Sequence, residues 1–219
     1  MLLKRLTIPF VAVALLVGAC GAPEFEYVKN SEQQTYFKVP NEWAQVDQDA
    51  LDAWAVEEEP DSAAAELRSQ LMWTVAYDAA EDPDLAHIAS TASTPQPVVW
   101  AKVERLVPTA AAAISLNELR DMWLPVTEDR RQFFEENGVE LPYFELLHDE
   151  VLTPEKGLHG VRVVYNWRMP GRLHTFDMTA LVNDDASVRY MLLVRCTASC
   201  YQERFDELQN IVTSFTVRS

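Results

Sequence analysis

Three consecutive stretches decide the fold: VRVVYNW (residues 161–167), LHTFDMTALV (173–182) and VRYMLLVRC (188–196). Within each stretch, apolar side chains recur at every second position, which is the period of a β-strand. Pro170-Gly171 separates the first two stretches and Asn183-Asp184-Asp185 the last two, and both are turn sequences. The pattern predicts a meander of adjacent antiparallel strands. Because both faces of the final strands are largely apolar, both faces need cover.

The segment after the last strand has the pattern of an amphipathic helix that would cover one of these faces. Its apolar side chains recur at helical spacing, at Tyr201, Phe205, Leu208 and Val212. Ser199 and Gln202 have the spacing of a capping box, in which each side chain satisfies a backbone amide of the first helical turn. We therefore expect a helix that begins after Ser199.

Upstream of the meander, shorter strands and helices alternate. Strand patterns cover residues 36–39, 71–78, 98–107 and 142–152, and helical patterns cover 47–58, 62–69, 115–123 and 128–137. Ser115 and Glu118 form a second capping box, and Gly138 stands where a helix-ending glycine belongs. The order predicts a single α+β domain over residues 36–219, with a mostly antiparallel sheet sandwiched between helices.

The N-terminus has the three parts of an export signal. Lys4 and Arg5 are followed by the apolar residues 6–17, which are too few to span a bilayer as a helix. Val17-Gly18-Ala19-Cys20 resembles the lipobox of bacterial lipoproteins, in which the cysteine thiol receives a diacylglyceryl group. This resemblance implies a signal peptide at residues 1–19 and lipid attachment at Cys20. The alternative is an ordinary secretory signal followed by a coincidental cysteine.

The charge of the chain predicts how it sits at a membrane. The 219 residues carry 18 basic and 34 acidic side chains, a formal net charge of −16, and loss of Lys4 and Arg5 with the signal peptide takes it to −18. Such a chain is repelled by nucleic-acid phosphates and by anionic lipid. We therefore expect no nucleic-acid partner, and an extracytoplasmic domain held at the cell membrane by its lipid anchor and a flexible tether at residues 20–35.

Cys196 and Cys200 are the other cysteines of the chain. Outside the cytoplasm, such a pair is most economically explained by a structural disulfide. The bridge would require a turn, since the Cα atoms must approach to about 5.5 Å. Free or redox-active thiols and a metal site are the alternatives.

No motif in the sequence indicates an enzyme, a cofactor or a metal. The six glycines form neither a dinucleotide-binding loop nor a P-loop, and no nucleophile elbow or HExxH motif is present. The histidines are scattered, at His87, His148, His159 and His174. His148-Asp149-Glu150 is the best local ligand cluster, and we interpret it as a solvated sheet end. We expect no catalytic residues, no metal site, and no cofactor beyond acyl groups on Cys20.

One strand has a pattern that indicates partner binding. Arg189 and Arg195 share a face of the last long strand, with Met191 and Leu193 between them. One interpretation is that the arginines pair with acidic residues of a covering helix. The other is a cationic, partly apolar docking strip for an acidic protein partner.

Two ends of the domain carry a family resemblance. YFKVPNEW (residues 36–43) and LVRCTASCY (193–201), which leads into IVTSFTV (211–217), resemble the LpqN-type lipoproteins of actinobacteria and the wider PsbP-like group. The resemblance implies an α/β/α sandwich and a non-enzymatic binding or assembly role in the cell envelope. The rival hypothesis is a carrier of a lipid or small apolar ligand, with an aromatic-lined cavity between sheet and helices.

Overall fold

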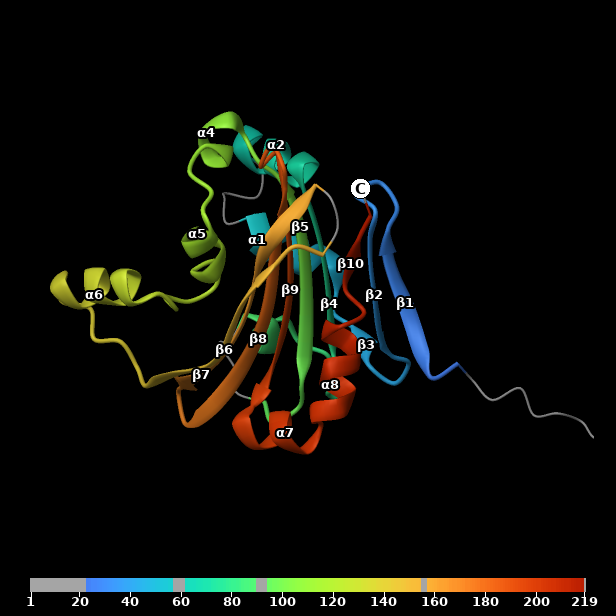
Figure 1. The fold of residues 1–219 in the computed structure, drawn as a ribbon. Coiled ribbons are helices and arrows are strands. Elements are labelled where there is room, and N and C mark those ends of the chain that lie inside the picture. The colour runs from blue at the N-terminus through green and yellow to red at the C-terminus, as the bar shows by residue number, and fades with distance from the viewer. Residues whose placement is uncertain (1–22, 57–61, 90–93, 155–156, 219) are drawn as a thin grey trace, which may run out of the picture.

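The computed structural model describes residues 23–56, 62–89, 94–154 and 157–218, and their strands form two antiparallel sheets (Figure 1). The strands are β1 Phe25–Asn30, β2 Thr35–Pro40, β3 Ala44–Gln45, β4 Met72–Asp78, β5 Val98–Arg105, β6 Phe144–Leu152, β7 Leu158–Met169, β8 Arg172–Asn183, β9 Val188–Thr197 and β10 Thr216–Val217. The larger sheet has the order β3-β4-β5-β9-β8-β7-β6, and the smaller has the order β1-β2-β10.

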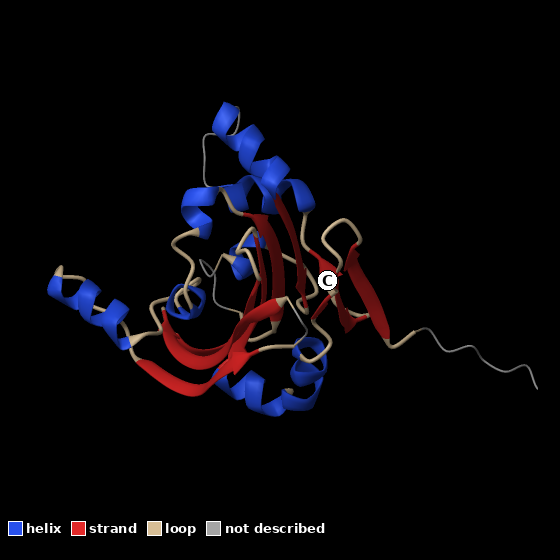
Figure 2. Cartoon of the chain, turned by 45° about the horizontal axis from the view of Figure 1, so that its top comes forward, coloured by secondary structure: helices blue, strands red, loops and turns tan. Residues whose placement is uncertain are grey.

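Helices lie on both sides of the larger sheet (Figure 2). They are α1 Gln48–Val56, α2 Ala63–Leu71, α3 Leu85–Ile88, α4 Pro108–Ala111, α5 Leu116–Arg120, α6 Glu128–Glu136, α7 Ala198–Glu203 and α8 Phe205–Val212. No helix within the described ranges is long and apolar enough to cross a membrane. The architecture confirms the predicted α+β class, a mostly antiparallel sheet between helices.

The larger sheet has an apolar core on each face. On one face, Leu51 of α1 shares a core with Met178 of β8. On the other face, Ile211 of α8 and Phe37 of the smaller sheet share a core with Val194 of β9. The smaller sheet therefore takes part of the cover that we expected helices alone to provide.

The predicted meander is confirmed. Met178 of β8 pairs with Val163 of β7 on one side and with Leu193 of β9 on the other. The β7–β8 turn contains Gly171 at a φ of +83°, a conformation that glycine adopts without steric cost. The short turn sets the register of the hairpin, and the register places apolar side chains of all three strands on the same face.

The prediction of a flexible tether over residues 20–35 is wrong for the residues from 25 onward. Phe25–Asn30 forms β1, which pairs with β2 from Phe25↔Pro40 to Asn30↔Thr35. Only Val28 of this strand is buried, while Tyr27 is 77% exposed. A strand that buries one side chain leaves almost no hydrophobic pattern, and its place is decided by hydrogen bonds to β2. Cys20 and the signal peptide lie outside the described residues.

The helix ends differ from the predicted ones at two places. The last helix is capped by Thr197 instead of Ser199, and it breaks at Arg204 into α7 and α8. The Ser115 hydroxyl accepts the predicted hydrogen bond from the Glu118 amide, but α5 ends at Arg120 instead of near residue 123. Gly138 has the expected positive φ directly after α6.

Gly160 of β7 provides a test of how closely the strands approach. A Cβ atom at this position would overlap the Ala180 carbonyl oxygen and lie 2.8 Å from Leu181 Cα. We expect Gly160→Ala to lower the free energy of unfolding by about 1–3 kcal/mol, the usual cost of overpacking, measured by urea denaturation. Gly171→Asn is the control, since a side chain there meets nothing within 4 Å and asparagine tolerates a positive φ. Equal losses from both variants would contradict the prediction.

Candidate functional site

The predicted docking strip on β9 is wrong, because its side chains face the core beneath α1 and α3. Met191 and Leu193 belong to this core and are 2% and 4% exposed, and Arg195 is 2% exposed. The alternation that suggested the strip is real, but the face that carries it is covered. Sequence periodicity shows that side chains share a face and does not show which face stays open.

Both arginines of that strip make contacts within the fold. Arg189 Nη2 donates to Glu104 Oε2 at 2.6 Å across the β5–β9 pair. The Arg195 guanidinium donates to the His87 carbonyl oxygen on α3 and lies 5.9 Å from the centre of the Phe176 ring. Burial lowers the pKa of Arg195 to about 10, which leaves it cationic at neutral pH. The acidic partner of Arg189 therefore lies on a neighbouring strand instead of a covering helix.

The open surface of the sheet lies at β6. This strand forms one edge of the larger sheet, so only its β7 side is paired in the part of the chain that the structure describes. Residues 145–151 are all exposed, and among them Leu146, Leu147 and Val151 are 45%, 49% and 52% exposed. An edge strand also presents unpaired backbone N–H and C=O groups. Exposed apolar side chains on such an edge indicate an interaction surface.

A β-bulge interrupts this edge. The pairing passes from Leu146↔Tyr165 to His148↔Val164 and leaves Leu147 without an opposite residue. Bulges bend a strand and re-aim one side chain. As a result, Leu147 and His148 both line the hollow between β6 and the C-terminal helices.

Each face of β6 borders a hollow. The hollow on the side of α7 and α8, here called the Phe205 hollow, has a volume of about 320 Å³. Its apolar wall is Leu147, Val164 and Phe205, and Phe205 is 50% exposed. Apolar side chains of a partner would therefore find matching surface on this face.

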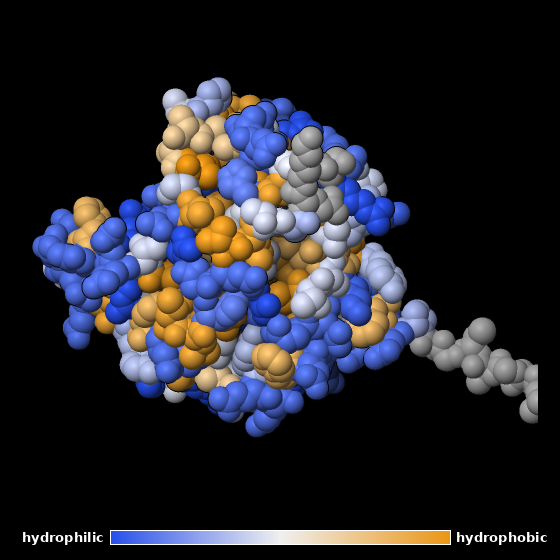
Figure 3. All heavy atoms as spheres, in the orientation of Figure 1, coloured by the Kyte–Doolittle hydropathy of each residue, from blue (hydrophilic) through white to orange (hydrophobic). Residues whose placement is uncertain are grey.

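The hollow on the opposite face, here called the Arg120 hollow, is polar. It has a volume of about 400 Å³ and lies between β6 and the first turn of α6. Arg120 Nε donates to both carboxylate oxygens of Asp149, at 3.0 and 2.9 Å, and Glu128 and Asp129 line the same space. Three carboxylates against one guanidinium make this face acidic. Figure 3 shows hydrophilic surface between hydrophobic patches on the face turned to the viewer.

A buried ionic network forms the floor of the Phe205 hollow. Arg162 donates from Nε and Nη2 to the two carboxylate oxygens of the fully buried Asp177, at 2.9 and 2.7 Å. The Tyr201 hydroxyl donates to Asp177 at 2.6 Å, and Gln209 Nε2 donates to the Tyr201 oxygen at 2.9 Å. Burial, and then the Asp177 carboxylate, raises the pKa of Tyr201, so that its hydroxyl remains a donor. The network ties both C-terminal helices to β7 and β8.

Sequence reasoning missed this network, although one signal was present. A hairpin that turns at Pro170-Gly171 places Val164 opposite Asp177 and Arg162 opposite Thr179. Arg162 and Asp177 are then diagonal neighbours on one face of the sheet, with opposite charges. The hairpin register therefore predicts the ion pair, whereas Tyr201 and Gln209 come from helices whose docking the sequence does not specify.

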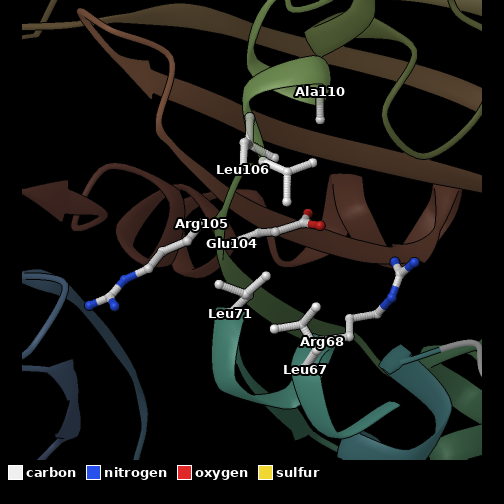
Figure 4. Close-up of a pocket in the computed structure, with 8 residues that line it drawn as sticks. Leu67, Arg68, Leu71, Glu104, Arg105, Leu106 and Ala110 are labelled. Carbon is white, nitrogen blue, oxygen red and sulfur yellow. The ribbon is translucent and has the colours of Figure 1, made fainter. Parts of the chain in front are cut away.

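A third hollow, of about 320 Å³, lies away from β6 between α2, α4 and the end of β5 (Figure 4). Leu67 and Leu71 face Leu106 and Ala110 across it, whereas the Arg105 guanidinium points away. The Glu104 carboxylate lies among these aliphatic side chains, and Arg68 also lines the hollow. Trp54, Trp100 and Trp123 pack on one another with ring centroids 5.0–6.2 Å apart, and none of them lines this hollow.

Cys196 and Cys200 are buried and are free thiols in the structure. A hydrogen bond to Cys200, together with burial, raises the pKa of the Cys196 thiol. The start of α7 brings the two side chains together, as the disulfide requires, and the disulfide itself stays a prediction. Among the histidines, His148 Nε2 lies 3.3 Å from Glu150 Oε2. No three metal-ligating side chains gather anywhere in the described ranges.

The fold, with its central antiparallel sheet between helices, defines a PsbP-like α+β domain. It is similar to cyanobacterial PsbP (CyanoP) from Synechocystis sp. PCC 6803, with a TM-score of 0.51 and 11% identity over 92% of this chain and 96% of that chain. LpqN from Mycobacterium tuberculosis, described as involved in cell envelope biogenesis, has a TM-score of 0.46 and 13% identity, over 89% and 91%. The Saccharomyces cerevisiae Ran-binding protein Mog1p has a TM-score of 0.39 and 12% identity, over 88% and 95%.

These likenesses concern the fold. The sequence matches no family model and no curated protein. At 11% identity, the likeness to CyanoP confirms the PsbP-like fold and carries nothing about a site or a partner. The relationship to LpqN-type lipoproteins stays a prediction.

His174 makes the stability of the fold depend on pH. It is fully buried in β8, and burial, then the charges of Arg195 and Arg172, lowers its pKa to about 4 from 6.5. Because the folded chain resists protonation, this contribution is fully present above pH 6.5 and is lost as the pH falls to 4. We expect the free energy of unfolding to fall by at most about 3 kcal/mol over that range.

Urea denaturation between pH 7.5 and 4 measures this effect. His174→Gln should flatten the pH dependence relative to the unsubstituted chain. His148→Gln, at an exposed position of β6, is the matched control and should leave it unchanged. The same slope in His174→Gln and in the unsubstituted chain would show that His174 is not responsible.

The Arg162–Asp177 pair predicts a second stability effect. Arg162→Met leaves the buried Asp177 carboxylate without its cationic partner, and we expect a loss of about 3 kcal/mol of unfolding free energy. The double variant Arg162→Met with Asp177→Leu removes both charges and should recover part of that loss. Thermal and urea unfolding measure it, and an additive loss in the double variant would contradict the prediction.

Proposed function

We propose that this chain is an extracytoplasmic lipoprotein, held to the cell membrane through Cys20, that acts as a non-enzymatic binding factor and captures another protein at the β6 edge. The observation that carries the proposal is the exposed, partly apolar edge strand with a hollow on each face. Binding proteins need accessible surface with apolar anchors and a polar rim, and this edge supplies both.

The position of the anchor is compatible with access to β6. The lipobox-like ending at Cys20 leaves four residues, 21–24, between the acylated cysteine and β1, and the five Cα–Cα steps from Cys20 to Phe25 reach at most about 17 Å. β1 and α6 lie on opposite sides of the molecule in both ribbon views (Figures 1 and 2). Since α6 leads into β6, a domain tethered at β1 would keep its β6 edge away from the attachment point. Its net charge of −18 would also hold it off anionic lipid.

The second candidate function is a carrier of a lipid or small apolar ligand. The hollow in Figure 4 favours it, because its volume of about 320 Å³ falls within the range of small-molecule sites and its lining combines aliphatic side chains with a few polar ones. A small molecule that copurifies with the chain, and is lost when Leu71 is replaced by aspartate, would support this function.

Lipid attachment at Cys20 is tested in the cell that produces the protein. We expect the mature chain to fractionate with membranes and to incorporate an alkyne-labelled fatty acid, because two or three acyl chains hold a protein stably in a bilayer. Cys20→Ala should abolish both the label and the membrane association, whereas Cys200→Ala should leave the label. A mature chain whose Cys20 carries no acyl group would refute the anchor.

A further inference from the structure

The β6 edge has features that specify the chemistry of its occupant, and the inference drawn from them rests on the proposed binding function. We infer that β6 receives, as an added strand along His148–Leu152, an extended segment of a partner protein in which basic and apolar residues alternate. The apolar side chains would enter the Phe205 hollow, and the basic side chains would face the Arg120 hollow.

The backbone of β6 points to a strand as occupant. An edge strand presents its outward amides and carbonyls in a row, which is a template for pairing with another extended segment. Among the residues that the structure describes, β6 pairs with β7 alone. β6 pairs residue by residue with β7 along His148–Leu152, and the bulge at Leu147 interrupts this pairing before His148. An added strand would therefore be short, with about five paired residues.

The two faces of β6 require different side chains from that strand. Successive residues of a strand point to opposite faces, so one set would meet each hollow. The Phe205 hollow offers Leu147, Val164 and Phe205, and its Arg162 charge is neutralised by Asp177. Apolar side chains of the added strand would contact Leu147 and Phe205 there, beside the polar side chains of His148 and Gln209 that line the same hollow.

The Arg120 hollow favours cationic side chains. It combines Glu128 and Asp129, both exposed in the first turn of α6, with Asp149, which already holds Arg120. A lysine or arginine opposite this group is attracted by an excess of negative charge at the rim, which steers encounter and selects the register.

Charge also argues against a second copy of this chain as the occupant. β6 contains Glu145, Asp149 and Glu150 and no lysine or arginine. Pairing two β6 strands would bring two such sets together across an inter-strand spacing of about 4.8 Å. Like charges so close destabilise the pair.

The test uses the purified mature chain and a synthetic peptide, acetyl-KVKVKVK-amide, in which basic and apolar residues alternate. Calorimetry measures its affinity, and hydrogen exchange locates it. We expect slowed exchange at the amides of residues 148–152. We also expect about tenfold weaker binding of the non-alternating peptide acetyl-VVVKKKK-amide, which has the same composition and charge. Equal affinity for both peptides, or no added protection of residues 148–152, would overturn the inference.

Charge-reversal variants separate this site from general electrostatic attraction. Glu128→Lys with Asp129→Lys should weaken binding of the alternating peptide about tenfold. Glu135→Lys with Glu136→Lys changes the net charge by the same amount at the other end of α6 and should change affinity little. Equal losses from both pairs would show that the peptide is attracted by overall charge and would overturn the inference.

A matched pair of variants tests the apolar contact. Phe205→Ser should weaken binding about tenfold, since Phe205 would anchor the partner. Phe133→Ser removes a similarly exposed phenylalanine from α6 and should have little effect. A larger loss of affinity in Phe133→Ser than in Phe205→Ser would overturn the placement of the apolar side chains.

Two further measurements separate the inference from the proposed function. A dimer detected by analytical ultracentrifugation that Leu147→Glu dissociates would assign the edge to a second copy and overturn the inference. A photo-crosslinking residue in place of Leu147, in the lipidated chain in its own cells, tests binding itself. If the crosslinker captures a protein but the alternating peptide does not bind, the inferred chemistry of the occupant is wrong and the proposed binding function stands. If it captures nothing, the proposed function fails as well.

Discussion

The burial of β8 and β9 on both faces is the constraint on which the rest of the structure depends. A strand that is apolar on both faces must be covered twice, so α1 and α3 occupy one side while α8 and the smaller sheet occupy the other. The hydrophobic free energy of these two cores is the main term that holds the domain together. Strands further from the centre receive less cover, and β6, at the end of the order, is left exposed along most of its length.

Several charged groups inside this double cover make contacts where separate elements meet. Arg162 and Asp177 join the strands to Tyr201 and Gln209 of the C-terminal helices. On the other face, His87 Nδ1 lies 2.6 Å from Oδ2 of the buried Asp78, and the Arg195 guanidinium donates to the His87 carbonyl oxygen. A buried charge costs several kcal/mol unless it is paired, so these contacts fix how the helices dock more than they add net stability.

The exposed edge and the proposed anchor belong to different ends of the molecule. β1 lies on the side of the molecule opposite α6, which leads into β6 (Figure 1), and the two hollows border β6. The bulge at Leu147 and the carboxylates of β6 are also the devices by which sheet edges avoid pairing with their own kind. The same features that discourage self-association therefore leave an edge open to a partner of complementary charge.

Much of the fold follows from the sequence, because strand alternation, turn residues and helix caps are local signals. The meander of residues 161–196 with its turn at Gly171, the Ser115 cap and the helix-ending Gly138 were all predicted and are present. The disulfide and the acylation of Cys20 stay predictions. β1 was missed because it buries a single side chain, and the Arg189–Arg195 strip was misplaced because periodicity does not say which face is covered. The edge position of β6 and the Asp177 network depend on strand order and helix docking. These come from contacts between residues far apart in the chain, and only the tertiary structure decides them.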